Sequence, residues 1–477
     1  MSTTDYRQVT AVLRRLGALL TWLNPVELVT LLSEVVREVA EPPPGDPDAL
    51  DLLAAAYRQA AGTLGATGAA GRAPEAFERA ADALADLAGT VRRQRWRHAE
   101  LHRQLHAAWY DATHVGRMPM PDPSALGELV GAVRELVAGC VALYTESLAA
   151  ADRAASRFAD LAGQARAAAA VAGGLAPQTA VTLAGLTVGV PGIGDGYDDG
   201  ILSLAQLRRA GRHTALAEPD RGAFTTLLDL AGTETERAWL YKALTAGHAL
   251  PELRAFAERI RGREPAWLDA HLSLIDRGGT GSQNRLGVDV RQYEDTTCGT
   301  TSLIVTRAEA DPVYALALTD GDFAANFAAE RATVHDRTNV VWPERFGTSP
   351  AGMAAWLNAH AAALGTGYRW ELVDDTDPRA ISAVLRQVVT AADSGHPVPI
   401  LLGGPVPRHY VLVIGHSGGD VLLYEPTGGR TVRVAEQDFL DGRLREPAGF
   451  DHVQAVVLPV DYLGQPVAAG NGLAGSK

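Results

Sequence analysis

The sequence predicts a multidomain protein in which an all-α N-terminal region precedes an α+β domain with an antiparallel sheet. The chain of 477 residues is longer than one ordinary domain, so two or three domains are expected. Alanine-rich segments typical of helices dominate residues 1–175. In residues 400–434 the pattern changes to short β-branched runs separated by Gly and Pro turns, which is typical of antiparallel strands. A helical half followed by a sheet half is an α+β arrangement.

Composition narrows the classes of function. The formal net charge of −13 at pH 7 means that the chain as a whole is expected to repel nucleic acid and anionic membranes. The two cysteines, Cys140 and Cys298, lie far apart and match no metal-binding spacing, so we expect no structural disulfide, metal or cofactor. The first residues lack a basic stretch followed by an apolar run. This predicts a cytoplasmic protein, or one exported by a route that needs no cleavable signal peptide.

Five segments predict the helices of an all-α domain over 1–175. They are 5–23, 24–40, 49–64, 74–112 and 124–172. The second segment begins with Asn24 as N-cap and Pro25 at the first helical position, where proline costs no hydrogen bond. The turn at 65–84 resembles the middle of the helical hairpins exported by type VII systems, but it lacks their tryptophan and no export tag follows. A helical region of this kind is expected to bind a helical protein partner.

The middle of the chain predicts a connector, a second helical domain and a linker. Residues 167–194 carry no charge, but Pro177 and Pro191 interrupt them, so we expect a packed helix and a Gly/Pro-rich connector over 176–200 rather than a membrane span. A small helical domain is expected over 201–276, and a flexible linker over 277–285.

Local signals fix several helix ends. Thr233 and Glu236 have the spacing of a capping box, with Gly247 placed to end that helix. In the last domain, 286–462, one helix is expected to open at Ser349 and another at Asp377. The second of these carries one apolar face, made by Ile381, Val384, Leu385 and Val388. Residues 463–477 are expected to form a flexible tail.

Cys298, within "QYEDTTCGTTSLIV", has the setting of a nucleophile. The first turn of a helix favours a thiolate through its unpaired amide groups and the helix dipole, and the stretch from Cys298 predicts such a helix. Gly299 allows the chain to turn tightly beside it. Gln292, six residues upstream, supplies a side-chain amide that together with the cysteine's own amide can stabilise an oxyanion.

A thiolate also needs a proton partner that is held by a third polar group. His409 opens the predicted strand "HYVLVIG", and Glu425 ends the next strand, "VLLYE". Because adjacent antiparallel strands can bring these side chains together, we expect Cys298, His409 and Glu425 to meet.

The C-terminal half resembles the papain-like cysteine peptidase superfamily, in the bacterial branch related to peptidases that process bacteriocin leaders. The resemblance covers residues 286–460 and rests on the ordered set "QYEDTTCG", "FGTSPAGMAAWLN", "SGHPVPILL", "HYVLVIG" and a closing "EP". It implies a papain-like fold with Cys298 as nucleophile and His409 as general base and acid. It also implies that Gln292 is an oxyanion donor and that Glu425 orients His409.

One residue departs from the family pattern. The family has aspartate or asparagine before the closing proline, whereas this chain has Glu425. Asp420, on the preceding turn, is the alternative acid. His416 is the alternative histidine, although its odd offset from His409 places it on the other face of a strand.

Three further motifs have weaker functional interpretations. His98, His102 and His106 form one stripe of a helix, but no zincin spacing accompanies them, so we expect a solvated or interface face rather than a metal site. The basic stretch around Trp96 is expected to pair with acidic helices. Residues 195–207 resemble a calcium loop, but Tyr197 and Gln206 stand where carboxylates are needed, so Ser203 is expected to cap a helix there.

The predicted function is that of a cysteine-dependent hydrolase acting on a peptide bond or a glutamine amide through an acyl-enzyme on Cys298. Peptidase, deamidase and acyl transferase share that intermediate, so the sequence does not separate them. The alternatives are a catalytically inert papain-like interaction protein, and a secreted effector or toxin that uses the same chemistry. A peptide or protein substrate is the expected partner.

Overall fold

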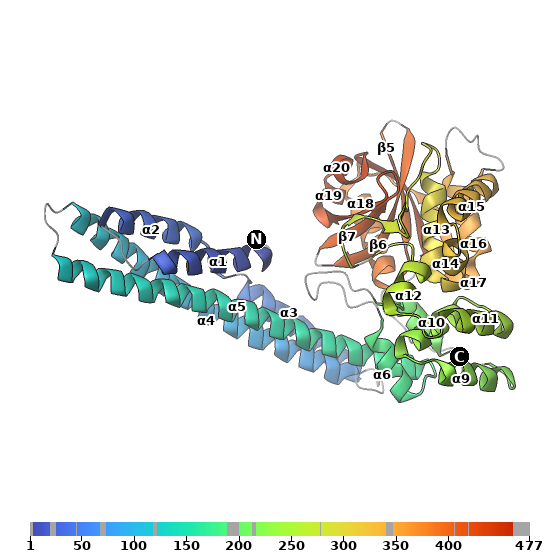
Figure 1. The fold of residues 1–477 in the computed structure, drawn as a ribbon, viewed down its shortest axis with the longest axis horizontal. Coiled ribbons are helices and arrows are strands. Elements are labelled where there is room, and N and C mark those ends of the chain that lie inside the picture. Colours follow the sequence, from blue (N-terminus) through green and yellow to red (C-terminus); the bar gives the residue numbers. More distant parts are fainter. Residues whose placement is uncertain are drawn as a thin grey trace. The chain divides into compact units, whose positions relative to one another are not determined.

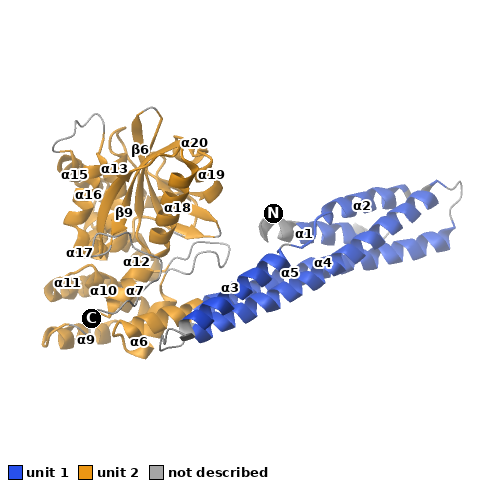
Figure 2. Ribbon diagram, turned by 180° about the vertical axis from the view of Figure 1, so that it is seen from behind, with its two compact units in different colours: residues 1–161 blue, residues 162–477 orange. Residues whose placement is uncertain are grey.

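The computed structural model describes residues 3–19, 25–43, 45–66, 73–117, 122–187, 200–211, 216–276, 278–339, 347–404, 406–417 and 419–460. The chain forms two compact units, residues 1–161 and 162–477 (Figure 2). The architecture confirms an all-α N-terminal region followed by an α+β part with an antiparallel sheet. Asn24 and the expected tail at 463–477 lie outside the described residues.

The N-terminal unit consists of long helices. They are α1 (Thr3–Leu19), α2 (Pro25–Glu38), α3 (Pro47–Ala66), α4 (Ala73–Gly116) and α5 (Pro123–Ala172). Leu13, Leu32, Leu105 and Tyr144 are buried in its main core, and Cys140 belongs to the same core with 2% of its surface exposed. All five predicted helices are therefore present in this order.

The second unit begins with the end of α5 and a block of short helices. They are α6 (Pro177–Gly185), α7 (Leu204–Ala210), α9 (Asp220–Leu230), α10 (Glu234–Thr245), α11 (Leu250–Ile260) and α12 (Pro265–Leu272). Part of the expected connector is thus helical, because Pro177 starts α6 and Leu183 is buried against the block. Ala167 and Leu316 share this core with the block, which explains why residues 201–276 do not form a unit of their own.

Helix caps follow the predictions with one difference. The Thr233 hydroxyl accepts from the Glu236 amide at 3.1 Å, as expected for the N-cap of α10. The Glu236 carboxylate, however, accepts from the amides of Gly232 and Gly262 rather than from the cap residue, so it ties the start of α10 to the end of α11. Gly247 follows the end of α10 with a positive φ of 88°.

A seven-stranded sheet organises the rest of the second unit. Its order is β1-β8-β7-β6-β5-β9-β4, and every pairing is antiparallel. The strands are β1 (Gly281–Ser282), β4 (Gly367–Leu372), β5 (Val398–Gly403), β6 (Pro407–Ser417), β7 (Asp420–Glu425), β8 (Arg430–Ala435) and β9 (His452–Val460), and β2 (Asn284–Arg285) pairs separately with β3 (Val288–Asp289).

The expected linker at 277–285 is therefore partly incorrect, because it contains β1 and β2. Gln283 accounts for the difference. Its backbone amide donates to Gly429 O at 2.7 Å, and its side-chain Nε2 donates to the Thr431 hydroxyl at 2.9 Å. These bonds hold a Gly-rich segment along the edge of the sheet, although the composition of that segment alone predicts flexibility.

Helices cover both faces of the sheet (Figure 1). One face carries α13 (Cys298–Ala310), α14 (Pro312–Thr319), α15 (Phe323–Thr338), α16 (Pro350–Ala359) and α17 (Ala361–Leu364), and the other carries α18 (Pro378–Asp393), α19 (Glu436–Leu440) and α20 (Arg445–Ala448). Alternate residues of β6 serve the two layers: Tyr410 and Leu412 pack with α13, whereas Val411 and Val413 pack with α18.

The predicted caps in this part are confirmed. Ser349 caps α16 and Asp377 caps α18, each by accepting a first-turn amide. The four residues expected on the apolar face of α18 are all buried. None of the helices in the described ranges is long and apolar enough to cross a bilayer.

Candidate active site

Cys298 is the first residue of α13 and is buried, with 4% of its surface exposed. The N-cap residue Thr297 gives no side-chain cap, because its hydroxyl donates instead to Glu294 O at 3.0 Å. The first-turn amides of α13 are thus left to act on the sulfur, together with the helix dipole. The backbone amide of Tyr410 also donates to Cys298 Sγ, at 3.4 Å.

Gly299 lets the start of α13 approach the sheet closely. A Cβ at this position would lie 2.8 Å from Thr348 Cβ and 3.1 Å from Tyr410 Cδ2. No side chain fits there without moving its neighbours. The glycine after the cysteine is therefore a packing requirement, and it allows Cys298 to lie beside Tyr410 of β6.

His409 lies next to Tyr410 on β6 and is 6% exposed. Its Nε2 is 2.9 Å from Glu425 Oε1, and because an ionised carboxylate only accepts, Nε2 donates. Nδ1 is then the ring nitrogen left for Cys298. Burial lowers the pKa of His409, but interactions with the Cys298 sulfur and the Glu425 carboxylate outweigh it and raise this pKa to about 9.

Glu425 ends β7 and is held by the turn that follows it. Its Oε1 accepts from the Thr427 amide and its Oε2 from the Gly428 amide, both at 2.7 Å. Arg430 Nε adds a cation 3.8 Å from Oε2. Burial raises the pKa of Glu425, but the bonds from His409 and the two amides prevail and lower it to about 2. Between about pH 2 and about pH 9, an ionised carboxylate therefore faces a protonated imidazole.

Gln292 is the fourth predicted residue, and its segment is fixed beside the same turn. It is 9% exposed, and its backbone amide donates to the carbonyl of Pro426, the residue after Glu425, at 2.8 Å. Its side-chain Oε1 is buried and has no hydrogen-bond partner among the described residues. The structure thus brings Cys298, His409 and Glu425 together and places the backbone of Gln292 next to them.

The alternative acid and histidine lie elsewhere. Asp420 is at the opposite end of β7 from Glu425, paired with Ala435 of β8. His416 lies between two other carboxylates, with Nδ1 3.1 Å from Asp393 and Nε2 2.7 Å from Glu436. Neither residue can take part in the site around Cys298.

Sequence reasoning missed the backbone groups of this site. The amides of Thr427, Gly428 and Tyr410 hold the acid and the sulfur, but every residue except proline carries such an amide. One signal was available: two glycines, Gly428 and Gly429, follow the closing "EP". A Cβ on Gly428 would lie 3.0 Å from Glu425 Oε2, so the loop that binds the carboxylate leaves little room for a side chain there.

The other motifs have structural partners. His98 Nε2 bonds to Val39 O at 2.8 Å. The His98 ring stacks on that of His102, which meets His106 edge to face. In the described ranges, no group of three or more His, Cys, Asp or Glu side chains is arranged to hold a metal ion.

The basic stretch pairs with acidic helices as expected, since Arg92 bonds to Asp51 and Arg97 to Glu146. Residues 195–199 of the calcium-like loop lie outside the described residues. The rest of that motif, Ser203 and Gln206, forms a capping box at the start of α7.

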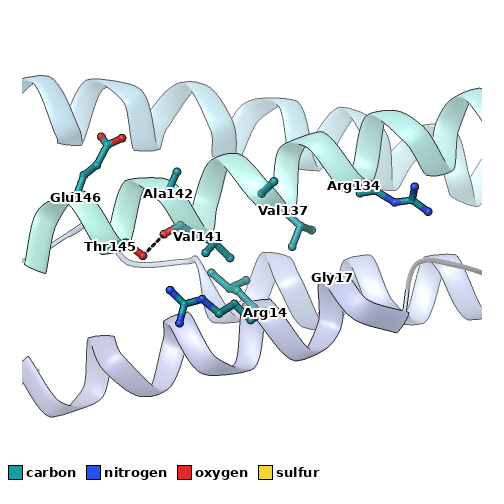
Figure 3. A pocket seen from close by; sticks show the side chains of 10 residues that line it. Arg14, Gly17, Arg134, Val137, Val141, Ala142, Thr145 and Glu146 are labelled. Atoms are coloured by element: carbon teal, nitrogen blue, oxygen red, sulfur yellow. Dashed lines mark hydrogen bonds between the residues drawn. The ribbon is translucent and has the colours of Figure 1, made fainter.

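A groove of about 550 Å³ lies between α1 and α5 in the N-terminal unit (Figure 3). Its walls are mainly apolar and include Gly17, Val137 and Val141, while Arg14 and Glu146 supply charge. The described lining contains no cysteine and no histidine.

Compared with known proteins, the chain matches no family model, no curated protein and no solved structure.

Proposed function

We propose that the protein is a papain-like cysteine hydrolase that cleaves a peptide bond or a glutamine amide through an acyl-enzyme on Cys298. The observation that carries the proposal is the placement of His409 between Cys298 and a carboxylate. The imidazole bonds to Glu425 through Nε2, and its raised pKa reflects interaction with the Cys298 sulfur as well as with Glu425. A buried thiol, imidazole and carboxylate in this order make up the nucleophile, the general base and its orienting group.

The reaction begins with the sulfur as thiolate and His409 as imidazolium. Cys298 Sγ attacks the amide carbonyl carbon, and the negative charge moves to the carbonyl oxygen. The Cys298 amide and the Gln292 side-chain amide are the proposed donors to that oxygen. The imidazolium then gives its proton to the amide nitrogen, the C–N bond breaks, and the amine leaves.

The second half of the reaction releases the acyl group. His409, now neutral, takes a proton from water while the water oxygen attacks the thioester carbon. The C–S bond breaks and Cys298 is regenerated. An amine in place of water would give acyl transfer, and a glutamine side chain as substrate would give deamidation. Glu425 stays ionised throughout, because its pKa of about 2 lies far below that of its partner.

The test is turnover of a mixed-sequence peptide library by the full chain, with products identified by mass spectrometry. We expect cleavage or deamidation products with wild type, and none with Cys298→Ser or His409→Ala. A run with added primary amine separates hydrolysis from acyl transfer. Products that persist in Cys298→Ser would contradict the proposal.

If the thiol is unreactive and no acyl-enzyme or product forms under any of these conditions, the inert interaction protein becomes the better proposal. The expected helical partner of the N-terminal unit remains a prediction in either case. If the protein is exported as an effector, the same reaction would take place outside the producing cell, and the expected products would be the same.

A further inference from the structure

Next to Gln292, two arginines surround an exposed tyrosine. The guanidinium carbon of Arg291 lies 5.0 Å from the centre of the Tyr293 ring, and that of Arg331 lies 4.5 Å from it. Arg331 comes from α15 and also lies over Phe327, at 5.3 Å. We call these three side chains, Arg291, Tyr293 and Arg331, the arginine cluster. Tyr293 is 51% exposed and Arg291 is also exposed, whereas Arg331 is partly buried.

The arginine cluster is fixed to the site by its backbone. Gln292, which lies between Arg291 and Tyr293, bonds to Pro426 beside Glu425. Tyr293 OH donates to Asp289 O at 3.3 Å, which limits where its ring can move. Phe327, under Arg331, belongs to the same buried core as Cys298. The cluster is therefore built into the loop that leads to the nucleophile.

Stacking on rings leaves the hydrogen-bonding edge of a guanidinium unused. The ring contacts the flat face, while the N–H groups point outward in the plane, in the fork that matches a carboxylate. Neither Arg291 nor Arg331 forms an ion pair with a described carboxylate, and Arg331 Nε is buried without a hydrogen-bond partner. Glu294 acts on Arg331 electrostatically, but it too lies beyond ion-pair distance.

Several arginines of this acidic chain form ion pairs, as Arg92 and Arg97 do, whereas the guanidiniums of Arg291 and Arg331 lie over rings. Burial lowers the pKa of the Arg331 guanidinium, and the charge of Glu294 offsets this effect only in part, so Arg331 lacks a close counter-charge in the described part of the chain. An anionic group of the substrate would supply the missing charge.

Building on the proposed function, we infer that the arginine cluster is a substrate subsite for a carboxylate side chain, so that the enzyme selects acidic peptide segments next to the scissile amide. A bidentate bond from Arg331 would fix the orientation of the carboxylate. Arg291, which is more exposed, would add mainly to attraction and to the rate of association.

The test measures how well peptides protect Cys298 from alkylation by iodoacetamide, using the full chain with Cys140→Ser. Three peptide pools of equal length and matched sequence carry Glu, Gln or Lys at the variable position. We expect the Glu pool to protect at about tenfold lower concentration than the Gln pool, and the Lys pool to protect least. High salt should reduce the preference, because screening weakens exposed charges most.

Variants assign the preference to the arginine cluster. Arg331→Gln and Arg291→Gln should each reduce the ratio of protection by the Glu and Gln pools, and the double variant should abolish it. Arg331→Lys keeps the charge but loses the fork, so it should retain part of the preference. Arg386→Gln, at an exposed position of α18, removes one positive charge elsewhere and should leave the ratio unchanged.

The alkylation rate without peptide separates the two proposals. If Cys298 reacts as a thiolate in every variant but the Glu and Gln pools protect equally, or no pool protects, the carboxylate subsite is refuted while the proposed chemistry stands. A preference that survives in the double variant would also overturn the inference. If Cys298 of the parent chain does not react as a thiolate, the proposed function itself fails.

Discussion

His409 and Glu425 lie on adjacent antiparallel strands with Nε2 2.9 Å from Oε1, and both side chains are more than nine-tenths buried. Two backbone amides hold the far side of the carboxylate, so the acid cannot turn away without losing charge-assisted bonds. The imidazole is consequently fixed with one nitrogen on the acid and the other free for the sulfur. This relationship determines the first prediction.

Glu425→Gln should lower the pKa of His409 from about 9 toward its ordinary value, because the variant removes the charge that favours imidazolium. The thiolate–imidazolium pair then becomes less stable, and alkylation of Cys298 near pH 6.5 should slow by about tenfold or more. Stopped-flow alkylation across pH checks this. An unchanged pH profile would show that Glu425 does not act on His409.

Gly428→Ala should disturb the same carboxylate from the other side. The added Cβ would lie 3.0 Å from Glu425 Oε2, so the carboxylate and the loop must move apart by a few tenths of an ångström, which should lengthen the amide bond to that oxygen. Losing one bond to a charged group costs about 1.5–3 kcal/mol, and a comparable loss in unfolding free energy is expected. Gly404→Ala is the matched control, since a Cβ there meets nothing within 4 Å. Equal stability of the two variants would contradict the structure.

Gly299→Ala tests the close approach of α13 to the sheet. Its Cβ would meet Thr348 and Tyr410, and overpacking of this kind costs about 1–3 kcal/mol. Denaturant unfolding measures the loss. Thr348→Gly removes Thr348 Cβ, the atom nearest to the added methyl group. In a double-mutant cycle, the losses in unfolding free energy from Gly299→Ala and Thr348→Gly should therefore be less than additive. Full additivity would mean that the contact is absent.

Stability should depend on pH through Glu425. Its pKa in the folded chain, about 2, lies below the ordinary value of 4.5, so its contribution is present above about pH 4.5 and is lost as pH falls toward 2. The difference in unfolding free energy between wild type and Glu425→Gln should therefore shrink over that range. Denaturant unfolding of both proteins at about pH 5 and about pH 3 measures this difference in unfolding free energy. A difference that stays constant would indicate an ordinary carboxylate.

Much of the fold was predictable because its signals are local. Helix starts at Ser349 and Asp377 and the helical stop at Gly247 depend on residues within one turn, and the structure confirms them. The alternation of β6 and the period of α18 likewise identified which residues are buried. The positions of His409 and Glu425 followed from the order of two adjacent strands.

The remainder depends on contacts between distant parts of the chain. Nothing near Gln283 indicates that it bonds to Thr431, and so the segment was expected to be flexible although it contains an edge strand. The same applies to the site. The amides of Thr427 and Gly428 hold the Glu425 carboxylate. Arg331 comes from α15, well after Tyr293 in the sequence, so only the folded chain brings the two side chains together.

The most direct test of the central claim is the rate of Cys298 alkylation by iodoacetamide as a function of pH. Cys140→Ser makes Cys298 the single thiol. Cys140 itself should react slowly, because burial raises the pKa of its thiol to about 11, and the smaller opposing effect of Arg97 does not cancel this. His409→Ala is compared with His416→Ala, whose imidazole pairs with Asp393 and Glu436. We predict fast reaction well below about pH 8 that is lost in His409→Ala and kept in His416→Ala. A profile like that of a free thiol, or no reaction until the protein unfolds, would contradict the catalytic interpretation.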